Sequence, residues 1–355
     1  MHMADALLSP AVAGTMYAAS GVAAALSIRA LKKDDNPERL PAMAVTAALV
    51  FAGQMINYTI PGTGSSGHLC GGMLLSALLG PQAGFLSMIV ILTIQCLFFA
   101  DGGLLALGAN IWNMAFYGCF AGYYLIWRPI MRSRLFHRME AEAAQRAKII
   151  LASILGCTIT LQMGAFSVVL ETTLSGITDL PFGAFTALMQ PIHLAIGLVE
   201  GLITSAILVF VYSTRPELIK DADASETSPT ARISLRALVV IIALITVLTG
   251  GVLSHFASSR PDGLEWALFG NEEEGFSANM GLNEESYGIE SDAAGAAAAV
   301  QEKTAILPDY AFSGSDSPAG TAVSGLAGSA VVAMAALLIC FAGHFFRRKE
   351  VEKYH

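Results

Sequence analysis

Long apolar stretches separated by short polar segments make up most of the chain. A helix needs roughly 20 mostly apolar residues to cross the hydrocarbon core of a bilayer, so the pattern predicts an all-α integral membrane protein. Nine segments are predicted to be helical, and the third of them is too short to cross a membrane by itself. They are residues 9–31, 40–60, 69–80, 82–100, 104–128, 148–171, 182–212, 236–256 and 321–346.

Basic residues lie in clusters between these segments and predict the orientation of the chain. Lys and Arg stay on the cytoplasmic side of a membrane, which places the amino terminus and the loop 58–68 outside and the carboxyl terminus inside. Three crossings are then needed between this loop and residue 128, so residues 69–80 are expected to form a short helix that turns at Gly80-Pro81. The clusters are Arg29, Lys32, Lys33 and Arg39; Arg128, Arg132, Arg134, Arg138, Arg146 and Lys148; Arg215 and Lys220; Arg232 and Arg236; and Arg347, Arg348 and Lys349.

The amino terminus lacks the features of a cleavable signal peptide, because no basic segment precedes the first apolar run and no small-residue cleavage site follows it. Met1 is therefore expected to remain as the exposed first residue. The predicted location is the cytoplasmic (inner) membrane of a bacterium or an archaeon.

Composition supports a membrane protein and excludes other classes. Of the 355 residues, 54% are hydrophobic and only 14% are charged, whereas a soluble domain has about a quarter charged residues. The formal net charge of −8 argues against binding to nucleic acid. The cysteines lack the spacing of a zinc site or a disulfide framework, so they are predicted to be small buried apolar residues. They are Cys70, Cys96, Cys119, Cys157 and Cys340.

Two polar regions divide the chain. Residues 221–232 are rich in Ser, Thr and Ala, and they lie in a predicted cytoplasmic linker over 216–235. Residues 257–320 contain twelve acidic and two basic residues and are expected outside the membrane. This segment is either a solvated acidic loop or a small domain whose field concentrates cations at the outer face. The predicted units are residues 1–215, the linker, residues 236–346 and a basic tail over 347–355.

The first two residues can chelate a metal ion in a way that an internal histidine cannot. The free α-amine of Met1, the deprotonated amide nitrogen of His2 and the Nδ1 atom of its imidazole close a five-membered and a six-membered ring around one ion. A second imidazole in the fourth planar position completes the square-planar set typical of Ni(II) or Cu(II). His68 is the candidate, because it follows a glycine- and serine-rich loop, residues 61–67, on the same predicted side as Met1.

A second polar cluster follows the fourth apolar segment. Asp101 lies at its predicted outer end, and Asn110 and Asn113 share one helical face. One interpretation is a helix cap and a turn. The other is a layer of outer partners that orient His2 or His68 through a ring N–H, as metal sites usually require.

Two ionisable residues, His193 and Glu200, lie two turns apart inside the seventh segment. Such residues are expensive in a membrane and are functional candidates, here for intramembrane coupling. Alternatively, they form a hydrogen bond with each other or hold a neighbouring helix in place. Three further buried polar residues, Gln95, Gln162 and Glu171, are predicted to be structural.

Motifs for nucleotide binding and catalysis are not found. The chain has no GxxxxGK[ST] phosphate loop, so it is not expected to hydrolyse ATP. It also lacks a Ser/His/Asp arrangement, and an enzyme is not expected. The first segment carries small residues at a spacing of four, Ala11, Thr15, Ala19 and Ala23, which favours close contact with another helix.

These motifs resemble the CbiM/NikM family, the substrate-capture membrane subunits of energy-coupling factor (ECF) transporters for cobalt and nickel. The resemblance rests on MHMADALLSP at the amino terminus, on SGHL at 66–69, on FADGG and GANIWNM over 99–114, and on IHLAIG with Glu200-Gly201. It extends to about Tyr212. Residues 261–265 read PDGLE, so the rest of the chain resembles the PDGLE domain, a small companion subunit fused here to the capture subunit.

The resemblance implies a bundle of about seven helices, followed by two helices that flank the external acidic segment. It implies that Met1, His2 and His68 bind Ni²⁺ or Co²⁺ as the transported substrate, with no organic cofactor, and it associates the chain with cobalamin biosynthesis. The implied partners are a transmembrane coupling (T) subunit, cytosolic ATPase subunits and the lipid bilayer. Nickel is favoured, because a planar nitrogen site with a deprotonated amide suits a low-spin d⁸ ion.

Two other functions are compatible with parts of this pattern. A secondary transporter would be driven by an ion gradient and would show inverted repeats and broken helices, which the sequence does not display. A membrane metal sensor would bind the ion without moving it. One position departs from the family, since Ala6 stands where many relatives have glycine.

Overall fold

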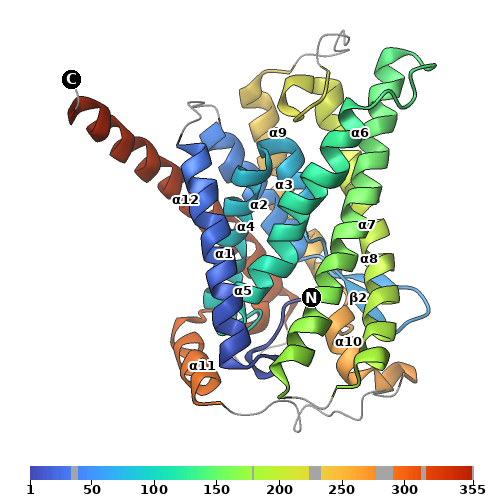
Figure 1. The fold of residues 1–355 in the computed structure, drawn as a ribbon, viewed down its shortest axis with the longest axis vertical. Helices are drawn as coiled ribbons and strands as arrows, with labels where there is room; N and C mark the ends of the chain where they lie inside the picture. Colours follow the sequence, from blue (N-terminus) through green and yellow to red (C-terminus); the bar gives the residue numbers. More distant parts are fainter. Residues whose placement is uncertain (33–38, 178–179, 224–232, 277–290, 313–316, 354–355) are drawn as a thin grey trace.

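The computed structural model describes residues 1–32, 39–177, 180–223, 233–276, 291–312 and 317–353. It is a helical bundle with one two-stranded hairpin (Figure 1). The elements are η1 (Asp5–Leu7), α1 (Pro10–Leu31), α2 (Arg39–Gln54), β1 (Tyr58–Ile60), β2 (Ser65–Gly67), α3 (Gly72–Leu79), α4 (Pro81–Phe99), α5 (Leu107–Asn110), η2 (Ile111–Trp127), α6 (Arg128–Arg132), α7 (Ala141–Ser175), α8 (Phe182–Thr214), η3 (Pro216–Leu218), α9 (Leu235–Gly251), η4 (Leu253–Phe256), α10 (Gly263–Phe269), η5 (Glu272–Glu274), α11 (Asp292–Thr304), η6 (Pro308–Tyr310) and α12 (Pro318–Lys353).

Six helices among the described residues are long and apolar enough to cross a membrane, which confirms the all-α integral membrane class. A seventh apolar helix, Ala42–Gln54 in α2, is shorter. The segment predicted over 104–128 is helical from Leu107, but Ile111–Trp127 is a π-helix. Hydrophobic periodicity does not separate an α-helix from a π-helix. The six long helices are Pro10–Leu31, Pro81–Phe99, Ala141–Ser175, Phe182–Thr214, Leu235–Phe256 and Ala319–Leu338.

The helix predicted to end at residue 60 stops earlier. α2 ends at Gln54, and Tyr58–Ile60 forms strand β1, which pairs antiparallel with β2 so that Tyr58 faces Gly67. The correction has a local cause, because aromatic and β-branched residues favour a strand. Proline at position 61 also disfavours the helical conformation of the residue before it.

The short helix between the hairpin and α4 forms as predicted. α3 spans only Gly72–Leu79 and is buried along nearly its whole length. The chain reverses at Gly80, whose φ of +87° favours glycine, and α4 begins at Pro81. α3 also lies very close to η2, since a Cβ on Gly72 would be 3.1 Å from the Cα of Gly118.

The basic clusters of several helices meet at one end of the bundle. The ends of α1, α3 and α6 line a cavity of about 280 Å³ together with Arg128, Arg132 and Lys220. Asp221 contacts both α6 and η2 at this end, because its carboxylate accepts a 2.6 Å bond from Arg132 Nη2 and another from the hydroxyl of Tyr123. α7 begins at Ala141, seven residues before the predicted start, with an ion pair between Glu142 and Arg146 in its first turns. Lys33 and Arg232 lie outside the described residues.

The C-terminal part packs along the side of this bundle. α12 contacts α2 and α9, and α9 crosses α12 where Gly250 meets Gly325, since a Cβ on Gly250 would lie 3.1 Å from that glycine. Figure 1 shows α10 and α11 at one end of the bundle and the end of α12 at the other. Of the external acidic segment, residues 277–290 and 313–316 lie outside the described residues, as do residues 224–232 of the predicted linker.

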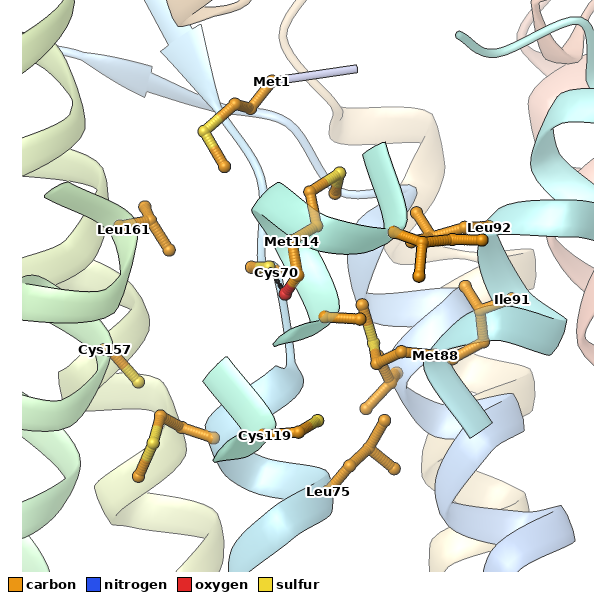
Figure 2. Close-up of a cluster of buried hydrophobic side chains, with 14 of the residues drawn as sticks. Met1, Cys70, Leu75, Met88, Ile91, Leu92, Met114, Cys119, Cys157 and Leu161 are labelled. Carbon is orange, nitrogen blue, oxygen red and sulfur yellow. Dashed lines mark hydrogen bonds between the residues drawn. The ribbon is translucent and has the colours of Figure 1, made fainter. Parts of the chain in front are cut away.

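The cysteines are buried and unlinked where their side chains are described. Cys70, Cys96, Cys119 and Cys157 are free thiols in the core, which confirms that they are small buried residues. Figure 2 shows three of them among the apolar side chains between the helices. Cys340 lies in the part of α12 whose side chains are not described.

Candidate metal centre

The amino terminus enters the helical bundle instead of lying on its surface. Met1 is 6% exposed and Met3 is 0% exposed. Figure 2 shows the Met1 side chain directed into the core, with Leu161 of α7 nearby. Gly164 leaves the space for it, because a Cβ there would lie 2.9 Å from the Met1 methyl carbon. The first residues are therefore held in one position by packing.

Asn110 fixes the backbone of the third residue. Its Oδ1 accepts a 2.7 Å bond from the amide nitrogen of Met3, and its Nδ2 donates to the Met3 carbonyl at 3.1 Å. The same carbonyl accepts a 2.9 Å bond from the amide nitrogen of Gly103. Asn110 thus reaches the main chain beside His2, and in this structure it does not contact a histidine ring.

The His2 ring is contacted on both nitrogens. Its Nδ1 lies 3.1 Å from Oδ1 of Asp101, and its Nε2 lies 3.3 Å from Oε1 of Gln95. Asp101 is in turn bound through Oδ2 by the hydroxyl of Tyr310, 2.5 Å away. Burial lowers the pKa of His2, which favours the neutral imidazole needed for a metal ligand. Asp101 is near His2, as one of the two interpretations of the sequence has it, whereas Gln95 was not expected there.

His68 stacks against His2. The two ring centroids are 5.5 Å apart and the ring planes differ by 18°. Nδ1 of His68 lies 2.9 Å from the carbonyl oxygen of Leu69, which leaves Nε2 as the nitrogen for a ligand. Burial, and next the nearby terminal ammonium, lower the pKa of His68 to about 4. The β1–β2 hairpin positions this histidine directly after β2.

The PDGLE turn completes the surroundings of the amino terminus. Asp262 Oδ2 lies 2.5 Å from the terminal nitrogen of Met1. Burial would raise the pKa of Asp262, but the terminal ammonium outweighs burial and holds that pKa below its usual range. The turn is bound to the hairpin, because the amide nitrogen of Ser66 donates to the Pro261 carbonyl at 2.8 Å. Sequence reasoning missed Asp262 as a site residue, although the PDGLE motif contained the signal.

Asn113 lies one layer deeper. Its Nδ2 donates to Glu171 Oε2 at 2.7 Å and lies 3.6 Å from the sulfur of Met3. Glu171 is also bound by the hydroxyl of Ser167 at 3.1 Å. Asn113 thus supports the Met3 side chain and does not reach either imidazole.

His193 and Glu200 do not bind each other. The Glu200 carboxylate accepts bonds of 3.0 and 2.9 Å from the amide nitrogens of Cys70 and Gly71, so it holds the start of α3. His193 Nδ1 lies 2.8 Å from the Met189 carbonyl of its own helix, and its buried Nε2 has no hydrogen-bond partner among the described residues. His193 lines a cavity of about 20 Å³ that Met1 and His68 also line.

These groups can form a nitrogen-rich metal site only if main-chain atoms take part. Across the described ranges, no three His, Cys, Asp or Glu side chains are arranged to hold a metal ion. The terminal amine, the His2 amide and the two imidazoles do meet in one place. A cleft of about 900 Å³ opens onto them and is lined by acidic residues that include Asp5, Asp101 and Glu265.

Comparisons with known proteins match both parts of the chain. The family model of the CbiM cobalt uptake substrate-specific transmembrane region matches residues 2–218, and the PDGLE domain model matches residues 236–344. A relative in Archaeoglobus fulgidus carries the provisional name of fused nickel transport protein NikMN; it is 34% identical over 94% of this chain and 95% of its own length. The fused nickel transport protein NikMN of Rhodobacter capsulatus is 30% identical over 94% of this chain and 95% of its own length. A crystal structure of a truncated transition metal transporter aligns with a TM-score of 0.50 and 31% identity, over 59% of this chain and 98% of the other.

Proposed function

The chain belongs to the CbiM family and carries a PDGLE domain behind it, and we propose that it captures Ni²⁺ or Co²⁺ as the substrate-binding component of an ATP-driven ECF importer. As a member of this family it is a multi-pass membrane component of a metal transporter and not an enzyme. What we propose is the identity of the transported ion, the atoms that bind it, the orientation of the chain in the membrane and the energy source for transport.

One observation carries the proposal: the amino terminus meets two imidazole rings in a buried position. The terminal nitrogen of Met1, the His2 amide and ring, and the His68 ring come from two segments of the chain, since His2 and His68 are 66 positions apart, and the rings stack at 5.5 Å. Three donors from Met1 and His2 close two chelate rings around an ion. His68 Nε2 supplies the fourth planar nitrogen, which completes a set typical of Ni(II).

The surroundings favour neutral nitrogen donors. A pKa of about 4 keeps His68 uncharged at neutral pH, so its Nε2 lone pair is available. Asp101 and Gln95 lie beside the His2 ring. When Nδ1 binds the ion, the ring N–H is on Nε2, and these side chains can accept its hydrogen bond. The His2 ring must turn for this, because Nδ1 faces Asp101 in the structure.

The outer cleft supports capture from outside the membrane. Acidic residues such as Asp5, Asp101 and Glu265 line the cleft that leads to the amino terminus, and among the described residues they outnumber its one arginine or lysine, Arg260. A cleft with an excess of negative charge raises the local concentration of cations. The basic clusters lie at the far end of the bundle, around Arg128 and Lys220. We place that end in the cytoplasm, with the amino terminus outside.

Nickel is the favoured ion, because a planar site with a deprotonated amide suits low-spin d⁸ Ni(II) better than Co(II). Geometry alone does not discriminate against copper, which binds nitrogen sites more tightly. The energy source is assigned to partners. The chain has no phosphate-loop motif, so a transmembrane coupling subunit and cytosolic ATPases would supply ATP hydrolysis.

Metal binding by purified full-length variants tests the site. His2→Ala is expected to weaken Ni²⁺ binding by more than about 100-fold, because loss of an outer partner alone costs about 10- to 100-fold. It should also remove the planar, diamagnetic nickel spectrum. His137→Ala is the matched control, since His137 is exposed and its ring contacts the Arg134 carbonyl. Unchanged binding by His2→Ala would refute the site.

Reconstituted vesicles test the energy source. Uptake of radioactive nickel should need ATP, the coupling subunit and the ATPases together with this chain. Uptake driven by an ion gradient with this chain alone would instead indicate a secondary transporter. Binding without uptake in the complete system would indicate a sensor.

A further inference from the structure

The carboxylate of Asp262 has two separate contacts. Its Oδ1 accepts bonds of 2.7 and 2.9 Å from the amide nitrogens of Leu264 and Glu265, and so caps α10. Its Oδ2 is 2.5 Å from the terminal nitrogen of Met1. Only the first contact is needed for the cap. The second joins the fused domain to the end of the chain that bears the proposed ligands.

The turn that carries Asp262 is held from several sides. The hydroxyl of Ser66 donates to the Arg260 carbonyl at 2.8 Å, and Glu265 Oε2 accepts a 3.1 Å bond from the Asp262 amide. Gly263 packs directly on α8, because a Cβ there would lie 2.6 Å from Ile192 and 3.0 Å from the His193 ring. The position of the Asp262 carboxylate is therefore determined before any ion arrives.

Two other contacts from the fused domain reach the same site. Gln301 of α11 donates to the Gly102 carbonyl at 2.9 Å, and the Tyr310 hydroxyl donates to Asp101. Both act on the turn that faces His2. The fused domain thus contacts the surroundings of both Met1 and His2.

We propose that Asp262 is a positioning residue for cargo binding: it holds the terminal amine by an N–H bond and orients the nitrogen lone pair towards the ion. This inference rests on the proposed function. A coordinated primary amine keeps two N–H bonds, so the contact with Asp262 persists when the nitrogen binds metal. The carboxylate also adds a negative charge beside a divalent ion that has one anionic donor, the amide. The PDGLE domain therefore completes the capture site and does not act in assembly alone.

Variants can separate this role from helix capping. Asn and Ser both cap helices well, so Asp262→Asn and Asp262→Ser keep an acceptor for the first turn of α10 and remove the carboxylate. Glu265→Gln is the matched control, because it alters the other half of the capping box and leaves Asp262 bound to Met1. Thermal unfolding of the metal-free proteins checks that every variant folds.

The first measurement needs no metal. An amine-selective acylating reagent, followed by mass spectrometry of the amino-terminal peptide, reports the reactivity of the Met1 amine. Both Asp262 variants should be acylated faster than the unmodified chain, and Glu265→Gln should not. Equal rates in all proteins would overturn the proposal, because they would mean that Asp262 does not hold the amine.

The second measurement is a Ni²⁺ titration of the same full-length proteins with a competing chelator. Loss of an outer partner typically costs about 10- to 100-fold in affinity, so the Asp262 variants should bind that much more weakly, while the exposed control His137→Ala should bind unchanged. Equal or tighter binding by Asp262→Asn would overturn the inference. His2→Ala separates the two proposals: if it binds normally, the site itself is wrong; if it fails while Asp262→Asn binds normally, only the inference is wrong.

Discussion

Two pairs of a histidine and a carboxylate inside the bundle can be compared: His2 with Asp101, and His193 with Glu200. In the first pair both ring nitrogens have partners, the ring stacks on a second imidazole, and a cleft of about 900 Å³ opens beside it. In the second pair Glu200 accepts hydrogen bonds from two backbone amides, and His193 faces a cavity of about 20 Å³.

The difference shows that burial of an ionisable residue is weak evidence for a ligand. His193 and Glu200 are each 1% exposed, whereas His2 and Asp101 are partly exposed, and only the first pair combines several nitrogen donors with an open route for an ion. Glu200 has a structural role that explains its position completely, since it holds the start of α3. The comparison therefore favours the first pair as part of the proposed metal site and assigns helix positioning to Glu200.

The largest effect outside the proposed ligands is expected at Asn110, which binds the main chain of Met3. Asn110→Ala removes both side-chain bonds to Met3, so the chelating residues lose their anchor, and Ni²⁺ affinity should fall by about 10- to 100-fold. Gln162→Ala is the control, because Gln162 binds the Gln190 carbonyl between α7 and α8. Isothermal titration measures the Ni²⁺ affinity of the two variants. Equal affinities would contradict the account.

The pH dependence of binding distinguishes the donors. For each proton that is released on binding, the metal affinity rises by about tenfold per pH unit. The affinity should therefore rise with pH, because the amide and the amine give up protons when they bind the ion. His68 should not contribute between pH 5 and 8, because its pKa is lowered to about 4 and the ring is already neutral. A chelator competition series over this range measures the slope. Affinity that does not change with pH would contradict a deprotonated amide ligand.

Glu200→Gln should affect folding and leave binding alone. It exchanges a carboxylate that accepts two buried backbone bonds for an amide that can accept with one oxygen only. Leaving a buried N–H unsatisfied costs about 1–3 kcal/mol, so thermal unfolding in detergent should begin at a lower temperature. Ni²⁺ affinity of the folded protein should stay the same. Weaker Ni²⁺ binding without a loss of stability would show instead that Glu200 has a role in metal binding.

His193→Gln is expected to have the smallest effect. The His193 Nε2 has no hydrogen-bond partner in the described part of the chain, and its Nδ1 binds only its own helix. Metal affinity and reconstituted uptake should therefore match those of the unmodified chain. Normal binding combined with lost uptake would reverse this assignment and make His193 part of the coupling path.

Sequence reasoning located the long helices, because roughly 20 apolar residues in succession have few alternatives in a membrane. It also found the short α3, since the count of crossings and Gly80-Pro81 required it. The β1–β2 hairpin was missed, because apolar composition dominated the β-branched signal in residues 58–60. The π-helical form of η2 was missed as well, since periodicity does not distinguish it.

The site was predictable where chemistry alone pointed to it. Met1 and His2 are adjacent and their chelating geometry needs no fold, and His68 follows a glycine-rich loop. Gln95 and Asp262 could not be placed in the same way. Each reaches the amino terminus from a distant segment, and only tertiary packing brings them to His2 and Met1.

The central claim is that the α-amine of Met1 binds the ion, and blocking that amine tests it most directly. Full-length protein would be prepared with a free terminus and with an acetylated terminus, each verified by the mass of the amino-terminal peptide, and both would be loaded with Ni²⁺. The account predicts a bound nickel ion with a planar, diamagnetic spectrum in the free form and loss of both in the acetylated form. The same nickel content and spectrum in the two forms would contradict it.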